Sequence, residues 1–185
     1  EREERLDILV NNAGFMKARQ EYKSLSNAIA EFGESDWDNA MDINLKALFF
    51  LTQQLLPRLQ QAATVDNPAR VINISSNAGI IPPHRHTDYA YTSSKGAVIN
   101  LTRHLAMSLG EENITVNTIS PGLFTTDMTK EIIERRGDAF ARSVPLGRIG
   151  RAEDIASAAI YLASPGGSWL TGVNLPVDGG NVVKR

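Results

Sequence analysis

Short apolar runs alternate with amphipathic stretches along the chain, which predicts a layered α/β fold. Four runs have the length and composition of buried strands, at residues 6–10, 71–75, 114–119 and 172–177. They are separated by stretches with apolar residues at helical spacing, at 35–59, 92–109, 127–142 and 152–163. Strands that alternate with helices form a doubly wound parallel sheet with helices on both faces, so we expect one such domain over residues 1–185.

Two of these runs are expected at the edges of the sheet. Proline cannot donate a hydrogen bond to a strand ladder, so Pro176 suits an edge position. We expect the run 6–10 to present an open apolar edge, which is an aggregation hazard unless a partner covers it.

The longest amphipathic stretch begins at Ser35, a typical N-cap residue that acidic residues follow, and continues to about Leu59. Its apolar residues cover more than one side, so we expect one side to meet the sheet and another to meet a partner subunit. Asn44 lies inside this run, where an amide is costly unless it is hydrogen-bonded. A satisfied buried amide and a functional residue are both compatible with this position.

Composition narrows the function classes. The chain has 185 residues, 42% hydrophobic and 22% charged, which is the size of one globular domain. Its formal charge of -2 gives no electrostatic reason to expect nucleic acid or an anionic membrane as a partner. The absence of cysteine excludes a thiol nucleophile and fits a cytoplasmic protein. The three histidines, His84, His86 and His104, lack the spacing of a metal site, so we expect no metal.

Tyr91 and Lys95 are candidates for acid–base chemistry. They lie four residues apart at the predicted start of a helix, so their side chains share a face. Lowering the pKa of a tyrosine by about three units needs roughly 4 kcal/mol, and we expect Lys95 and a cationic cofactor ring to supply it. Tyr89 lies six residues from Lys95 and therefore points away from it. The alternative for Tyr91 and Lys95 is a packing residue and a solvated charge.

Small and polar residues follow three of the predicted strands. They are Asn11-Asn12-Ala13-Gly14, Ser75-Ser76 and Ser120-Pro121-Gly122. The carboxyl ends of parallel strands form the crevice where open α/β sheets bind ligands, so we expect these segments to line one site. An ordinary turn is the alternative for Pro121-Gly122.

In this order, the motifs resemble those of the short-chain dehydrogenase/reductase family, and the resemblance covers nearly every residue. It rests on Asn11-Asn12-Ala13-Gly14, Asn44, Ser76, Tyr91 with Lys95, Pro121-Gly122 with Thr126, and Asp178-Gly179-Gly180. The nearest group includes the 3-oxoacyl reductases. Within it, residues 68–74 resemble the ketoacyl reductases linked to bacterial glycolipid synthesis.

The resemblance implies a Rossmann-like fold and hydride transfer between NADP or NAD, with a slight preference for NADP, and a small carbonyl or secondary-alcohol substrate. It implies that Tyr91 exchanges the proton, Lys95 lowers the pKa of that tyrosine and holds the ribose, and Ser76 steadies the carbonyl oxygen. It also implies that Asn44 interrupts its helix and supports a proton relay. The implied cofactor contacts are Asn12, Ala13, Gly14, Tyr91, Lys95, Pro121, Gly122, Phe124 and Thr126.

The family likeness also bears on substrate and assembly. It implies that residues 127–142 close over the substrate and that residues 15–34 form part of the substrate-side wall, although a surface insertion is an equal alternative for 15–34. It further implies a homo-oligomer, dimer or tetramer, that forms through the helices 36–59 and 92–109.

The glycine-rich turn G-x-G-x-x-G that opens a dinucleotide-binding fold does not occur in the sequence. The chain therefore resembles a family member that lacks about its amino-terminal third, including the first strands. One rival function is accordingly a non-catalytic fragment that keeps the site residues but does not bind a dinucleotide productively. A second rival, a serine hydrolase built on Ser76, is disfavoured because no G-x-S-x-G elbow surrounds that serine.

Overall fold

The computed structural model describes residues 3–16, 24–81 and 88–184. Its centre is a four-stranded parallel sheet in the order β1-β2-β3-β4, which confirms the predicted fold class. The strands are β1 (Ile8–Asn11), β2 (Ala69–Ile74), β3 (Ile114–Pro121) and β4 (Asn174–Val177).

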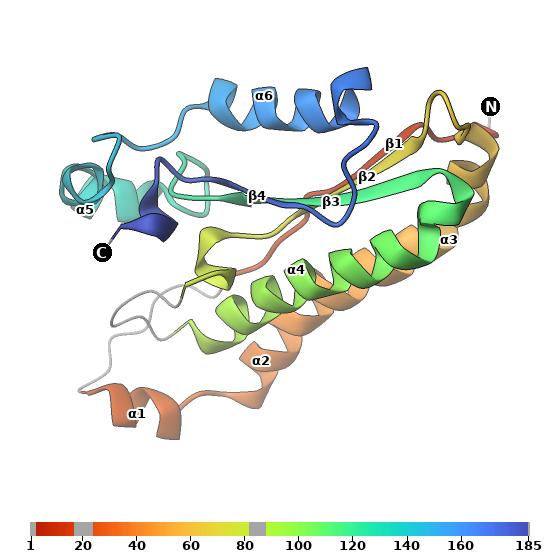
Figure 1. The fold of residues 1–185 in the computed structure, drawn as a ribbon. Helices are drawn as coiled ribbons and strands as arrows, with labels where there is room; N and C mark the ends of the chain where they lie inside the picture. The colour runs from red at the N-terminus through yellow and green to blue at the C-terminus, as the bar shows by residue number, and fades with distance from the viewer. Residues whose placement is uncertain (1–2, 17–23, 82–87, 185) are drawn as a thin grey trace.

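Helices cover both faces of the sheet, as the alternating pattern predicts. The α-helices are α1 (Leu25–Ala30), α2 (Glu34–Met41), α3 (Ala47–Ala62), α4 (Tyr89–Leu109), α5 (Lys130–Ser143) and α6 (Ala152–Ala163). A π-helical turn, η1 (Asp42–Lys46), joins α2 to α3. Short 3-10 turns are η2 (Asn77–Gly79), η3 (Gly110–Glu112), η4 (Pro165–Gly167) and η5 (Asn181–Val183). Figure 1 shows α3 and α4 on one face, α6 on the other, and α5 with the chain's C-terminus near the carboxyl ends of the strands.

The core consists of two apolar layers, one on each face of the sheet. Against α3 and α4 lie the buried residues Leu9, Leu59, Ala62, Ala69, Val71, Ala106, Leu109, Ile114 and Val116. Against α6 lie Ile72, Ile119 and Leu162. The strands alternate between these layers because successive side chains point to opposite faces.

The edges of the sheet agree with the sequence. Pro176 lies in β4, which is an edge strand, so its missing N–H costs no ladder hydrogen bond. β1 forms the other edge, and Ile8 and Val10 are 43% and 47% exposed there. This edge is therefore apolar and open within the described residues, as expected.

A row of buried polar side chains crosses β1, β2 and β3 near their carboxyl ends. Asn11, Asn73 and Thr118 are neighbours in the β1-β2-β3 register. Asn11 donates to the Asn73 Oδ1 at 2.9 Å and to Thr52 Oγ1 at 3.1 Å, while Asn73 donates to Thr102 Oγ1 at 2.9 Å. Thr118 donates to the same Thr102 oxygen at 2.6 Å. A one-residue slip of any strand would break this buried row, so it fixes where each strand ends.

Two helix starts differ from the sequence-based expectation. The helix predicted to begin with Ser35 as its cap begins at Glu34, and its N-cap is Gly33, whose carbonyl accepts from the N–H groups of Asp36 and Trp37. Ser35 lies inside the first turn, so the cap prediction is wrong. Within the segment 15–34, α1 was not expected; Ser24 caps it by accepting from the Asn27 N–H.

Some expectations fall outside the described residues. His84, His86 and residues 17–23 are among these positions. In the described ranges, no helix is long and apolar enough to cross a membrane. No group of three or more histidine, aspartate or glutamate residues in the same ranges could hold a metal ion.

Candidate active site

Three of the predicted residues meet at the carboxyl end of β2. Tyr91 lies in the first turn of α4, and Ser76 lies two residues after the end of β2. The Ser76 hydroxyl lies close enough to the Tyr91 phenol to act on its pKa, so the two oxygens face the same site. Lys95 Nζ lies over the Tyr91 ring, 5.8 Å from its centroid. The Tyr89 ring instead packs edge-on against Phe32, with centroids 5.5 Å apart, as its spacing from Lys95 predicts.

In the chain alone, burial and two neighbouring residues determine the direction of the Tyr91 pKa shift. Burial raises the pKa of Tyr91 above its ordinary value, the Ser76 hydrogen bond acts in the opposite direction, and the charge of Asp88 raises it further. Acidification of Tyr91 by Lys95 together with a cationic cofactor ring stays a prediction, because the raised pKa describes the chain without that ring. Tyr91 is held in its protonated form at neutral pH.

Burial acts on Lys95 as well. Its side chain is almost fully enclosed, and desolvation lowers its pKa from 10.5 to about 8. Nζ donates to the Ile74 carbonyl at 2.9 Å, which is its one hydrogen bond within the described ranges. An ammonium has three donors, so Lys95 keeps donors for a further acceptor.

Asn44 occupies the π-helical turn between α2 and α3. A π-helical turn is a local break in the α-helical ladder and occurs often at functional sites, so the structure confirms the predicted interruption. The buried amide accepts from the Phe15 N–H at 2.6 Å and donates to the Phe15 carbonyl at 2.9 Å. It also donates to Ser94 Oγ at 2.9 Å. Both the satisfied-amide and the functional interpretation fit these contacts.

Two serines to which the sequence assigned no role of their own support these residues. Ser94 is fully buried and donates to the Tyr91 carbonyl at 2.7 Å, so it links Asn44 to the turn that carries Tyr91. Ser75 donates to the Lys95 carbonyl at 2.6 Å. Both stand next to a predicted residue in the sequence, and that adjacency is the signal that could have found them.

The residues after β1 form an open approach to Lys95. Asn12, Ala13 and Gly14 are exposed. A Cβ at Gly14 would lie 3.5 Å from Lys95 Nζ and 3.7 Å from Asn44 Oδ1, so a side chain there would occupy the space beside both polar groups. The uncovered ammonium donors and this side-chain-free position fit a hydroxyl-bearing ligand such as the ribose of a nicotinamide dinucleotide.

The residues after β3 form a separate group at the same end of the sheet. Pro121 ends β3, and Gly122 packs so closely on the strand neighbour Asp178 that a Cβ would lie 2.8 Å from its Cα. Phe124 pairs through its backbone with Gly150, and Thr126 hydrogen-bonds to Thr129 within its own turn. The described contacts of Phe124 and Thr126 thus lie within this loop region rather than with Tyr91 or Lys95.

Beyond this group lies a partly open cavity of about 250 Å³. Its lining includes Phe124, Arg148, Asp154 and Asp178. Arg148 and Asp154 pair there at 2.6 Å and 2.9 Å, and this pairing lowers the pKa of Asp154 to about 2. Each charged residue of this lining has a hydrogen-bond partner within the chain.

Comparison with known proteins agrees with this geometry. A family model described as "Enoyl-(Acyl carrier protein) reductase" matches residues 1–181. The rhamnolipids biosynthesis 3-oxoacyl-[acyl-carrier-protein] reductase of Pseudomonas aeruginosa is 44% identical over 178 residues, which are 95% of this chain and 66% of that protein. The chain therefore spans about two thirds of the length of the curated relatives it matches.

Solved structures extend the likeness to three dimensions. The Pseudomonas aeruginosa RhlG/NADP active-site complex superposes with a TM-score of 0.87 at 42% identity, covering 97% of this chain and 67% of that one. A short-chain dehydrogenase/reductase of Brucella melitensis superposes with a TM-score of 0.83 at 30% identity, covering 98% and 66%. The family-model match over residues 1–181 and these likenesses show that the chain belongs to the short-chain dehydrogenase/reductase family.

Proposed function

We propose that the chain carries the acid–base site of an NAD(P)-dependent oxidoreductase that interconverts a small carbonyl compound and the corresponding secondary alcohol. The observation that carries the proposal is the convergence of Tyr91, Ser76 and Lys95 beside the open position Gly14. A proton donor, a second hydroxyl and an ammonium with uncovered donors at one strand end are what carbonyl reduction requires of a protein.

Tyr91 is the proton donor in the proposed reduction. The raised pKa keeps the phenol protonated at neutral pH, which is the form that gives a proton to the carbonyl oxygen. The Ser76 hydroxyl faces the Tyr91 phenol, so it is placed to hold the same oxygen. The reverse reaction needs the phenolate, and its rate is therefore expected to rise with pH.

Lys95 and Asn44 support the proton donor Tyr91. Lys95 holds the cofactor ribose and favours the phenolate once a proton has left Tyr91. Asn44 supports the return of protons to Lys95. Asn44 Oδ1 and Lys95 Nζ border the same space beside Gly14, because a Cβ added at Gly14 would lie 3.7 Å from the first atom and 3.5 Å from the second.

NADP or NAD is the proposed cofactor, and when bound it supplies or takes the hydride. Asn12, Ala13 and Gly14 would hold it together with Tyr91 and Lys95. The group after β3, Pro121, Gly122, Phe124 and Thr126, would hold the nicotinamide end. Support for NADP comes from the similar Pseudomonas aeruginosa structure, which is an NADP complex.

The substrate proposed is of the 3-oxoacyl type. Support comes from the 44% identical relative, whose name describes a 3-oxoacyl-[acyl-carrier-protein] reductase of rhamnolipid synthesis. Helix α5 supplies a candidate cover for it, because the helix buries none of its residues yet has half-buried Ile132 and Ile133. An amphipathic helix without a buried face can be completed by an apolar ligand.

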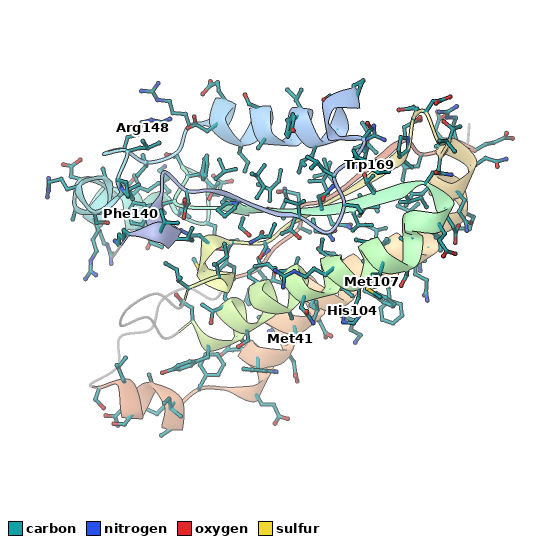
Figure 2. The ribbon with its side chains drawn as sticks, in the orientation of Figure 1. Met41, His104, Met107, Phe140, Arg148 and Trp169 are labelled. Carbon is teal, nitrogen blue, oxygen red and sulfur yellow. The ribbon has the colours of Figure 1, made fainter. Side chains whose placement is uncertain are left out.

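A homo-oligomer that forms through residues 36–59 and 92–109 belongs to the same proposal. Supporting it are exposed apolar residues on these helices, among them Phe50 at 47%, Leu51 at 45% and Met107 at 83%. Figure 2 shows Met107 and His104 on the side of α4 that is turned away from the sheet. A cytoplasmic location fits a cysteine-free chain that uses a nicotinamide cofactor.

Binding of NADPH and NADH to the 185-residue chain tests this proposal against the non-catalytic fragment. The fluorescence of the reduced nicotinamide is followed as the chain is titrated, and binding by the wild type is expected. Gly14→Val should abolish it by filling the space beside Lys95, whereas Gly110→Ala, which has nothing within 4 Å of the added Cβ, should leave it unchanged. Absence of binding by the wild-type chain would favour the non-catalytic alternative.

A further inference from the structure

The segment that follows β2 is hydrogen-bonded to Lys95 in α4. The Ile74 carbonyl accepts from Lys95 Nζ at 2.9 Å, and the Ser75 hydroxyl donates to the Lys95 carbonyl at 2.6 Å. A few residues on, Gly79 lies directly on the α4 backbone. Its added Cβ would lie 2.6 Å from the Lys95 carbonyl carbon and 2.7 Å from the Gly96 nitrogen.

This approach leaves no room for any side chain at position 79. The atoms that a Cβ would meet belong to the backbone of α4, so no side-chain rotation can relieve the overlap. The facing residue of α4 is also glycine: a Cβ at Gly96 would lie 3.3 Å from the Gly79 carbonyl oxygen. The loop and the helix therefore touch through two glycines.

The contact is rigidly connected to Ser76. The Ser76 carbonyl accepts from the Gly79 N–H at 3.0 Å, and the Ser76 hydroxyl accepts from the Ala78 N–H at 3.1 Å. This closed turn, η2, contains Gly79 itself. A displacement of Gly79 away from α4 must therefore move Ser76 relative to Tyr91 and Lys95.

We propose that Gly79, with Gly96 facing it, is a positioning residue that sets the separation between the Ser76 turn and helix α4 and thereby aligns Ser76 with Tyr91 and Lys95. The inference rests on the proposed function for its catalytic meaning, but the geometry it describes can be tested without turnover. Gly79 touches neither substrate nor cofactor in this account and acts through Ser76 and Lys95.

Three alanine substitutions differ in how closely the added Cβ approaches neighbouring atoms. Gly79→Ala places the Cβ against backbone atoms, Gly96→Ala places it at 3.3 Å, and Gly110→Ala places it in open space. Alanine is a better helix former than glycine, so Gly96→Ala is not expected to lower the unfolding midpoint. Any effect of Gly96→Ala on the site is then separable from an effect on stability.

The readout is the titration of Lys95 and Tyr91, followed by NMR of the chain with labelled lysine and tyrosine and assigned with Lys95→Met and Tyr91→Phe. In the wild type, burial sets the Lys95 pKa at about 8. If the segment after β2 moves away from α4, water reaches Lys95 Nζ and the Lys95 pKa rises toward 10.5. The rise should be largest in Gly79→Ala, smaller in Gly96→Ala and absent in Gly110→Ala. Turnover of NADPH with a 3-oxoacyl thioester should fall in the same order, through kcat rather than through KM for NADPH.

If the Lys95 pKa in Gly79→Ala equals that of the wild type, the proposal is overturned, whatever the turnover. If Gly79→Ala does not fold, Gly96→Ala decides: unchanged titrations and unchanged kcat in that variant overturn it equally. Failure of the proposed function gives a different result. If the wild-type chain shows no turnover but the Lys95 pKa still shifts in the predicted order among the three variants, the positioning role stands and the oxidoreductase function does not.

Discussion

Replacement of Lys95 by methionine tests whether the buried ammonium is held at a cost to stability. Lys95 is 3% exposed, and its pKa of about 8 lies below the ordinary 10.5. That difference corresponds to about 3 kcal/mol by which burial disfavours the charged form at neutral pH. Methionine fills similar space without a charge but loses the hydrogen bond to Ile74, worth about 1 kcal/mol. Lys95→Met should therefore be more stable than the wild type by about 2 kcal/mol at neutral pH while losing turnover.

The stability difference between Lys95→Met and the wild type should depend on pH. Because the folded-state pKa is depressed, the contribution of Lys95 to stability is present above about pH 10.5 and is lost as the pH falls through about 8. The advantage of Lys95→Met should thus be full below about pH 8 and shrink steadily toward about pH 10.

Urea unfolding followed by circular dichroism across this range measures the difference. The control is Lys46→Met, which removes the same charge from an exposed pair with Asp42 and should change the free energy of unfolding by less than about 1 kcal/mol. A Lys95→Met chain that is less stable than the wild type at neutral pH, or an advantage that does not shrink as the pH rises, would refute the reasoning.

Two further predictions concern polar contacts around the site. Asn44→Ala leaves both main-chain groups of Phe15 without their partner and should lower the free energy of unfolding by about 2 to 3 kcal/mol, with faster hydrogen exchange at the Phe15 amide; unchanged exchange would contradict it. Asp154→Asn removes the carboxylate that Arg148 holds, so its melting temperature should lie below that of the wild type at neutral pH. The gap should close as the pH falls from about 4 through the Asp154 pKa of about 2, and a gap that persists under acid would argue against the pairing.

Much of the fold was predictable because its determinants are local in the sequence. Apolar runs bounded by small residues located β1 to β4, and parallel strands bring their carboxyl ends to one edge. That rule alone brought Ser76 and the residues after β1 to one edge of the sheet. The break in the helix at Asn44 was predictable from the family resemblance and not from its apolar surroundings.

The features that the sequence did not reveal depend on tertiary contacts. The direction of the Tyr91 pKa shift is set by how much water the fold removes, which spacing along a helix does not report. The role of Gly79 arises from a backbone approach between segments far apart in the chain, whereas in sequence it reads as an ordinary turn residue. The helix begins before Ser35 because the Gly33 carbonyl, two residues earlier, accepts from the N–H groups of Asp36 and Trp37.

Turnover of the Tyr91→Phe variant tests the central claim most directly. The rate of NADPH oxidation with a short 3-oxoacyl thioester is compared between the wild type and Tyr91→Phe, with the Kd for NADPH measured in parallel and with Tyr161→Phe, half exposed on α6, as the control. Loss of the phenol hydroxyl should lower kcat on the order of 10² to 10⁴-fold while the Kd and the control stay near wild type. A Tyr91→Phe chain that turns over at the wild-type rate would contradict the assignment of Tyr91 as the proton donor, and with it the proposed oxidoreductase site.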